Sequence, residues 1–278
     1  MKILYGVIHL PALPGSPESR LSLEAIEARA LKDARAYARA GFDGLVVENF
    51  GDAPFWPDRV GPETVAAMAR IARAIRLEQP GLALGVNVLR NDGEAALAVA
   101  AAAEADFIRV NVLSGVSHSD QGTLTGRAAQ ILRLRRALDS AVRLFADVDV
   151  KHAVMAAHRD PLHQAEDLVE RAGADALLVS GRATGEPPDA ELVDRLAARF
   201  PAIPVLVGSG LSADNAPRLL ARAAGALVGT AVKQGKVTRN PVDPAAAAAL
   251  VAALRGPAAT EAGGGGSEGP AAGRPLGV

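Results

Sequence analysis

Short runs rich in β-branched residues alternate with longer alanine-rich stretches along almost the whole chain. The first pair is a predicted strand at 4–10 and a predicted helix at 22–41, with Ser22 as N-cap and Gly41 as C-terminal stop. The other predicted strands lie at 44–49, 82–90, 106–113, 142–152, 176–181, 203–210 and 225–233. The other predicted helices lie at 62–78, 93–105, 126–139, 161–173, 188–200 and 212–223. Eight strands, each followed by a helix or a tail, are typical of a (β/α)8 TIM barrel.

An open, doubly wound sheet is the structural alternative for this alternation. Such a sheet usually contains fewer units, and a dinucleotide-binding one carries G-x-G-x-x-G after its first strand. Here the first strand leads into HLPALPGSP at 9–17, which lacks that motif. We therefore expect an α/β fold with one (β/α)8 barrel over 1–255. The remaining residues, 256–278, are dominated by glycine, proline and alanine and predict a disordered tail.

The composition narrows the class of partner. A formal net charge of −1 and 3% aromatic residues argue against a nucleic-acid partner. The absence of cysteine excludes disulfides and cysteine-ligated zinc, and it fits a reducing cytoplasm. No apolar run is long enough to span a bilayer, so we expect a cytoplasmic protein without an integral membrane segment. The sequence leaves open whether the chain forms a homo-oligomer.

Polar residues alternate with valine or isoleucine in three consecutive predicted strands. In FADVDVKH (145–152) the valines share one face, and two aspartates and a lysine share the other. The valine and isoleucine faces suit the surrounding helices, so the polar faces point into the barrel. These faces carry Asn87, Arg109, Asn111, Asp147, Asp149 and Lys151. His9 and Glu48 end the first two strands, and active sites of such barrels lie at these strand ends.

Two interpretations of these polar residues compete. Arg109 and Asp147 alone would most simply form a structural ion pair, because a buried charge is costly unless it is paired. Six polar residues converging from three strands favour a ligand site instead.

Glycines follow the last two predicted strands. VGSG provides Gly208, Ser209 and Gly210, and VGT provides Gly229 and Thr230. Glycine lets backbone N–H groups approach an anion, and barrels of this type often bind phosphate after their seventh and eighth strands. The alternative is that each glycine merely permits a tight turn. The pairing of the two segments on adjacent strands favours a site for the phosphate of a substrate.

No cofactor is predicted. Asp147, Asp149, Glu48 and His9 offer donors for a divalent metal, but no ligand motif specifies one. Lys151 offers an amine for a Schiff base, yet the neighbouring acids would raise its pKa and so oppose that role.

Several longer motifs resemble the BtpA/SgcQ family. They are VIHLPALPGSP (7–17), GLVVENFGDAPF (44–55), VGPETVAAM (60–68), LGVNVLRND (84–92), ADFIRVNVLSG (105–115), DQG (120–122), ADVDVKHA (146–153), ALLVSGRATG (176–185), PVLVGSGLSADN (204–215), VGTAVKQ (228–234) and NPVD (240–243). The resemblance implies a phosphate-binding (β/α)8 barrel similar to phosphoribosylanthranilate isomerase. It also implies an association with photosystem I biogenesis, peripheral to the thylakoid, through one member, and with sugar utilisation through another.

Two functions follow as hypotheses. The first is an isomerase, epimerase or lyase acting on a small phosphorylated metabolite. Asp147 or Asp149 would be its general base and Glu48 or His9 its general acid, while an arginine and two asparagines, Arg109, Asn87 and Asn111, would orient the substrate. The second is a non-catalytic assembly factor that uses the aromatic segment 50–60 as a docking surface. We expect that segment to cover the barrel mouth instead, because it follows the second strand.

Overall fold

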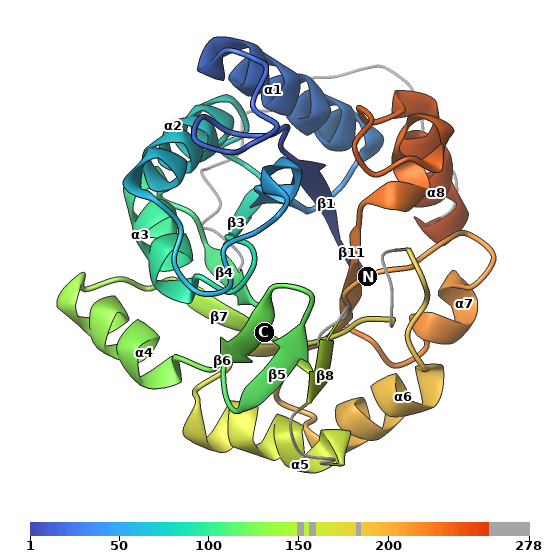
Figure 1. The fold of residues 1–278 in the computed structure, drawn as a ribbon. Coiled ribbons are helices and arrows are strands. Elements are labelled where there is room, and N and C mark those ends of the chain that lie inside the picture. The colour runs from blue at the N-terminus through green and yellow to red at the C-terminus, as the bar shows by residue number, and fades with distance from the viewer. Residues whose placement is uncertain (149–152, 156–159, 182–184, 256–278) are drawn as a thin grey trace, which may run out of the picture.

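The structure is a computed structural model that describes residues 1–148, 153–155, 160–181 and 185–255 (Figure 1). Asp149 and Lys151, and the tail predicted at 256–278, lie outside the described residues.

Within these residues, eight parallel strands close into a barrel in the order β1-β11-β10-β9-β7-β4-β3-β2, which confirms the predicted fold class. The strands are β1 (Ile3–His9), β2 (Gly44–Glu48), β3 (Ala83–Asn87), β4 (Phe107–Val110), β7 (Arg143–Val148), β9 (Ala176–Val179), β10 (Val205–Val207) and β11 (Gly225–Val228). The helices form a ring outside them (Figure 1). They are α1 (Leu23–Ala40), α2 (Pro62–Glu78), α3 (Gly93–Ala103), α4 (Ala128–Ala137), α5 (Pro161–Glu166), α6 (Ala190–Arg199), α7 (Ala216–Leu219) and α8 (Pro244–Arg255).

Short helical turns complete the chain. The 3-10 turns are η1 (Phe50–Asp52), η3 (Thr230–Val232) and η4 (Gln234–Lys236), and α5 continues into the π-helical turn η2 (Asp167–Arg171). The caps predicted for the first helix are confirmed. The amide of Ala25 donates to the Ser22 hydroxyl at 3.2 Å, and Gly41 adopts φ 88° with its amide donating to Ala38. Glycine is suited to that left-handed position because it has no Cβ.

Two predicted elements differ from the structure. The segment 114–125, which lies between a predicted strand and a predicted helix, forms a hairpin of β5 (Val116–Ser119) and β6 (Gly122–Thr125). The strand β8 (Ala153–Met155) pairs with β5, which makes a three-stranded antiparallel sheet of β5, β6 and β8. Of the strand predicted over 142–152, the described residues show β7 over Arg143–Val148. The hairpin has few apolar residues, so its alternation is too weak a signal for a strand.

The predicted helix at 212–223 is reduced to α7. Its first residues form a turn instead, since the amide of Ser212 donates to Asn215 Oδ1 at 2.8 Å and the amide of Asn215 donates to the Ser212 hydroxyl at 3.4 Å. Such local side-chain bonds compete with the helix ladder.

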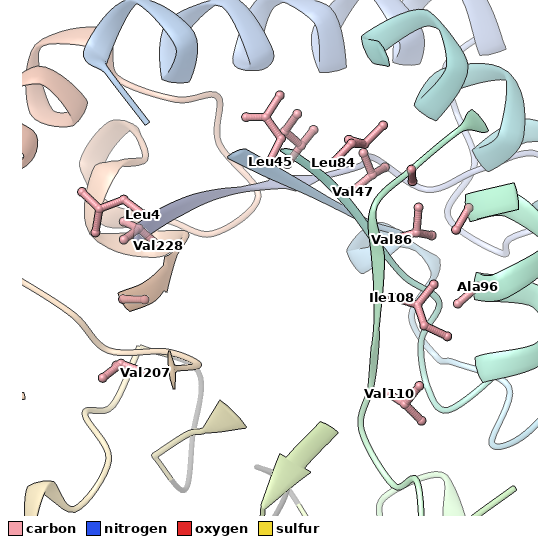
Figure 2. Packing of buried hydrophobic residues seen from close by; sticks show 14 of the residues in the cluster. Leu4, Leu45, Val47, Leu84, Val86, Ala96, Ile108, Val110, Val207 and Val228 are labelled. Atoms are coloured by element: carbon pink, nitrogen blue, oxygen red, sulfur yellow. The ribbon is translucent and has the colours of Figure 1, made fainter. Parts of the chain in front are cut away.

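The core has two main parts, and they confirm the predicted alternation of faces. Val86, Ile108 and Val110 face the helices, on the same side as Ala96 of α3 (Figure 2). The barrel interior holds a separate apolar cluster in which Phe107 and Phe145 stack with ring centroids 4.2 Å apart. Residues two places further along these strands therefore also face the interior, nearer the carboxyl ends.

Candidate active site

A row of polar residues crosses four neighbouring strands at one level. His9 of β1 is the register partner of Glu48 in β2, Glu48 of Asn87 in β3, and Asn87 of Arg109 in β4. All four positions face the interior, directly above the aromatic layer that includes Phe107. The row forms because these four residues are register neighbours near the carboxyl ends of their strands. The alternation of faces along each strand then directs all four side chains inward.

Arg109 and Asp147 form a buried ion pair. Arg109 Nε and Nη2 donate to both carboxylate oxygens over 3.0–3.3 Å, and the two side chains are 2% and 0% exposed. Asn111 Nδ2 adds a third donor to Asp147 Oδ2 at 2.5 Å. Burial alone would lower the pKa of Arg109, but the carboxylates of Asp147 and Glu48 raise it above its ordinary value. Arg109 therefore stays charged, and Asp147 is its counter-ion.

Glu48 is the other buried carboxylate of the mouth. It is 5% exposed, and Asn87 Nδ2 donates to its Oε2 at 2.9 Å. Among the residues that the structure describes, no second hydrogen-bond donor reaches this carboxylate. Glu48 thus retains acceptor capacity that a ligand can use.

In the described part of the chain, two cavities open at this end of the barrel. The first cavity, of about 620 Å³, is lined by His9, by the turns at 208–212 and by 229–230. The second cavity, of about 470 Å³, is lined by Asn87, Asn111 and the segment around Phe55. Glu48 and Arg109 line both cavities. These two side chains therefore stand where a ligand occupying both cavities would pass.

Asp147 does not lie on the wall that the two cavities share. It points into the barrel as predicted, but it is 1% exposed, its oxygens are held by Arg109 and Asn111, and it lines neither cavity. This geometry fits the ion-pair interpretation better than that of a general base in contact with substrate. His9 does line the first cavity, and its ring contacts Phe50 edge to face with centroids 5.0 Å apart.

The glycine turns predicted for phosphate line the first cavity, and packing also explains part of their composition. Gly208, Ser209, Gly210, Gly229 and Thr230 are all on its wall. A Cβ on Gly210 would lie 2.1 Å from the carbonyl oxygen of Glu186, and Gly210 has φ 72°. A Cβ on Gly229 would lie 2.6 Å from the His9 ring. Close packing thus requires glycine at 210 and 229, and the same turns form part of the cavity wall.

A comparison with known protein families shows to which family the chain belongs. The family model described as "BtpA family" matches residues 1–256. The chain belongs to the BtpA family. An uncharacterized protein of Thermococcus kodakarensis is 48% identical to this BtpA-family chain, over 87% of the chain and 90% of the relative. The Photosystem I biogenesis protein BtpA of Synechocystis is 42% identical, over 90% of the chain and 86% of the relative.

Solved structures share the fold of this BtpA-family chain at low identity. The N-(5'-phosphoribosyl)anthranilate isomerase of Pyrococcus furiosus aligns with TM-score 0.55 and 15% identity, over 91% of this chain and 98% of that one. The tryptophan synthase alpha chain of Legionella pneumophila aligns with TM-score 0.55 and 14% identity, over 91% of this chain and 90% of that one. At these identities the likeness shows the barrel fold alone.

Several residues that line the two cavities were not among the predicted site residues. Arg90 lines the second cavity, and burial lowers its pKa although Asp147 and Glu48 counteract that effect. Asp120, at the tip of the hairpin, and Arg239 line the same cavity, whereas Lys236 lines the first. The DQG at 120–122 stood among the family motifs, so that motif was a signal for the hairpin tip. Lys236 and Arg239 come from a loop with no periodic pattern.

The structure adds two observations on metals and membranes. Within the described ranges, histidine and acidic side chains do not gather in groups of three that could hold an ion, and Asp149, one of the four proposed ligands, lies outside them. No helix in the described part of the BtpA-family chain has the length and apolar character needed to cross a bilayer.

Proposed function

We propose that this protein is a cytoplasmic enzyme, an isomerase, epimerase or lyase, that acts on a small phosphorylated metabolite such as a sugar phosphate or phosphoribosyl compound. The observation that carries the proposal is the position of Glu48. This buried carboxylate holds one hydrogen bond within the described residues, from Asn87, and lies with Arg109 on the wall shared by two cavities at the carboxyl ends of the barrel strands. Active sites of (β/α)8 barrels lie at these ends.

Glu48 is the acid–base group of the proposed reaction. Its carboxylate takes a proton from a substrate carbon beside a carbonyl, and the electrons of that C–H bond form an enolate. When that carbon carries a hydroxyl the intermediate is an enediolate, and isomerisation follows when the hydroxyl proton moves to the former carbonyl oxygen and the carbon proton returns to the former carbonyl carbon. In a reverse aldol cleavage, Glu48 instead takes the proton of a β-hydroxyl, the C–C bond breaks to release an aldehyde, and the enolate that remains is protonated at carbon. Asn87 orients the carboxylate. Positioned proton transfer of this kind contributes about 10²–10⁴-fold to rate.

Arg109 supplies the positive charge opposite the developing enolate oxygen. Its pKa is raised, so the guanidinium keeps its charge throughout the reaction. Asp147 fixes the guanidinium through two of its nitrogens and acts as a positioning residue. A charge held in place before the reaction stabilises the transition state without reorganisation. Epimerisation requires a second acid–base group, and His9 on the wall of the first cavity is the candidate for that role.

The first cavity is the proposed phosphate site. The turns at 208–210 and 229–230 give backbone groups on its wall, and Lys236 lies at its exposed rim without an ion-pair partner among the described residues. The likeness of fold to the N-(5'-phosphoribosyl)anthranilate isomerase of Pyrococcus furiosus supports this assignment by analogy.

The decisive experiment measures proton exchange at carbon. Wild-type protein is incubated with a panel of sugar phosphates in D₂O, and loss of the C–H signal beside the carbonyl is followed by NMR. We expect exchange with at least one member, and we expect Glu48→Gln to slow it about 10²–10⁴-fold. The amide oxygen of the substituted side chain still accepts from Asn87, so the fold should survive.

The matched control is Glu191→Gln, an exposed carboxylate in the first turn of α6. It should exchange at the wild-type rate. Equal rates for wild type and Glu48→Gln would remove Glu48 from the mechanism, and no exchange with any phosphorylated compound would reject the proposed function.

A second candidate function is a non-catalytic assembly factor, peripheral to a membrane complex, of the type named in the Synechocystis relative. One observation favours it: the Trp56 side chain is 66% exposed. Against it, Phe50 and Phe55 of the same segment line the second cavity, as expected for a segment at the barrel mouth.

A further inference from the structure

Asn111 carries a buried acceptor that the described part of the protein does not satisfy. Asn111 is 2% exposed and lies on the wall of the second cavity. Its Nδ2 donates to Asp147 Oδ2. A carboxylate bonded to Arg109 can only accept, so the amide nitrogen must face Asp147 and the orientation of the amide is fixed by chemistry. Asn111 Oδ1 then has no hydrogen-bond partner among the described residues. Buried polar atoms without a partner are rare and indicate a missing donor.

The charges of the described residues around the second cavity cancel. Three arginines face three carboxylates there, counting the Asp147 that pairs with Arg109. They are Arg90, Arg109 and Arg239 against Glu48, Asp120 and Asp147. Arg239 also forms an ion pair with Glu18, in which Nη1 lies 2.7 Å from Oε2. As far as the structure describes it, this wall has no surplus positive charge for a second anion, so its ligand is an uncharged group.

The remaining wall is apolar and partly aromatic. Phe50, Phe55 and Leu89 line it together with the polar residues. Apolar faces beside a few fixed polar atoms are typical of small-molecule sites, and the volume of about 470 Å³ lies in the usual range for them. Such a wall suits the C–H faces of a carbohydrate chain or ring, with hydroxyls directed at the polar atoms.

We infer that the second cavity binds the uncharged, hydroxyl-bearing part of the substrate, and that Asn111 Oδ1 accepts a hydrogen bond from one of its hydroxyls. The inference rests on the proposed function and deepens it. The substrate extends from a phosphate in the first cavity, past Glu48 and Arg109, to a polyhydroxylated portion in the second. Glu48 and Arg109 line both cavities, so the reacting carbon lies between the two parts.

Calorimetric titration tests this arrangement with three probes: inorganic phosphate, glycerol 3-phosphate and ribose 5-phosphate. For wild type, ribose 5-phosphate should bind at least roughly tenfold more tightly than inorganic phosphate, and glycerol 3-phosphate should lie between them. Asn111→Ala should reduce that advantage roughly tenfold, because it removes the acceptor for a hydroxyl. The affinity for inorganic phosphate should stay unchanged, because phosphate binds in the first cavity, which Asn111 does not line. Gln130→Ala, an exposed amide on α4 that lines neither cavity, is the matched control and should keep the advantage.

The outcomes separate the inference from the function on which it rests. If no phosphorylated probe binds, the proposed function fails. If ribose 5-phosphate binds no more tightly than inorganic phosphate, or if Asn111→Ala keeps the full advantage, the inference is overturned while phosphate binding stands. If Asn111→Ala does not fold, two other measurements test the inference: the affinity of Asn111→Ser for ribose 5-phosphate, and the affinities of wild type for ribose 5-phosphate and 2-deoxyribose 5-phosphate. The inference is rejected if Asn111→Ser binds ribose 5-phosphate as tightly as wild type does and wild type binds the two sugar phosphates equally.

Discussion

The ion pair of Arg109 and Asp147 is the most constrained contact of the barrel interior. Both side chains are almost completely buried, and Asn111 adds a third hydrogen bond. Removing charges from water is costly, so a buried pair is not by itself a strong source of stability. Breaking the pair is different, because one charge is left without compensation.

Asp147→Asn should therefore lower the free energy of unfolding by about 3 kcal/mol, since it leaves the Arg109 charge buried. Urea unfolding monitored by circular dichroism measures the change. The control is Glu78→Gln, which breaks the exposed pair of Glu78 with Arg35 and should cost less than about 1 kcal/mol. Equal costs for the two variants would show that the barrel pair is not effectively buried.

The inward direction of these residues could be predicted from the sequence, which also offered the Arg109–Asp147 ion pair as one of two interpretations, but the contacts of the pair could not be predicted. Asn87, Arg109, Asn111 and Asp147 all face the interior, as the alternation with valine and isoleucine predicted. The register sets Arg109 opposite Phe145, so Asp147 stands two residues further along its strand. Arg109 reaches it through its long side chain. Alternation predicts the face of a residue, whereas partners depend on register and rotamer, which the sequence does not show.

At the scale of elements, one buried contact fixes the loop after the last barrel strand. Lys233 Nζ lies 2.7 Å from Asp33 Oδ2 of α1, and the amide of Val242 donates to Asp33 Oδ1 at 2.8 Å. Burial lowers the pKa of Lys233, and Asp33 opposes that effect. The same loop carries Lys236 and Arg239 to the two cavities. The contact therefore links an outer helix to the rim of the candidate site.

Lys233→Met should cost about 3–5 kcal/mol of stability, because it leaves Asp33 charged and buried. Adding Asp33→Asn removes that charge while an amide oxygen still accepts from Val242, so the double variant should be more stable than Lys233→Met alone. Thermal unfolding of both single variants and the double variant measures this coupling. Strictly additive losses would mean that the two side chains do not interact.

Elements with strong periodicity could be predicted, and those held by sparse contacts could not. The helix at 62–78 was predicted to the residue, with proline at its first turn. The hairpin of β5 and β6 was missed, since in its eight paired positions Ser117 and Leu124 alone are buried. A strand that buries so little leaves almost no alternation to detect.

At the scale of the whole molecule, the fold could be predicted because eight apolar strands repeat with helices between them. A parallel sheet is covered on both faces, so every strand carries its own signal. The closed barrel then brings together strand ends that are far apart in the sequence. A closed barrel can serve catalysis or docking, and the difference depends on what the surface of its mouth binds.

Trp56 offers a test of that choice on the intact molecule. It is the only tryptophan of the chain, its side chain is 66% exposed, and its carbonyl accepts a hydrogen bond from the amide of Arg90 at 3.1 Å. Phe55, its neighbour, lines the second cavity. Ligand entry there should transfer the indole to a less polar environment. We expect ribose 5-phosphate to shift Trp56 emission to shorter wavelength, and vesicles of anionic lipid to leave it unchanged.

Two controls show which of the two functions a change in Trp56 emission supports. Trp56→Phe should abolish the signal without changing calorimetric affinity, which shows that the indole reports on binding and does not cause it. Inorganic phosphate, bound in the first cavity, should produce a smaller shift than the sugar phosphate. A blue shift with vesicles and none with any phosphorylated compound would instead make the aromatic segment a docking surface. It would then favour the assembly factor over the enzyme, because the one exposed indole beside the mouth would be reporting contact with a partner.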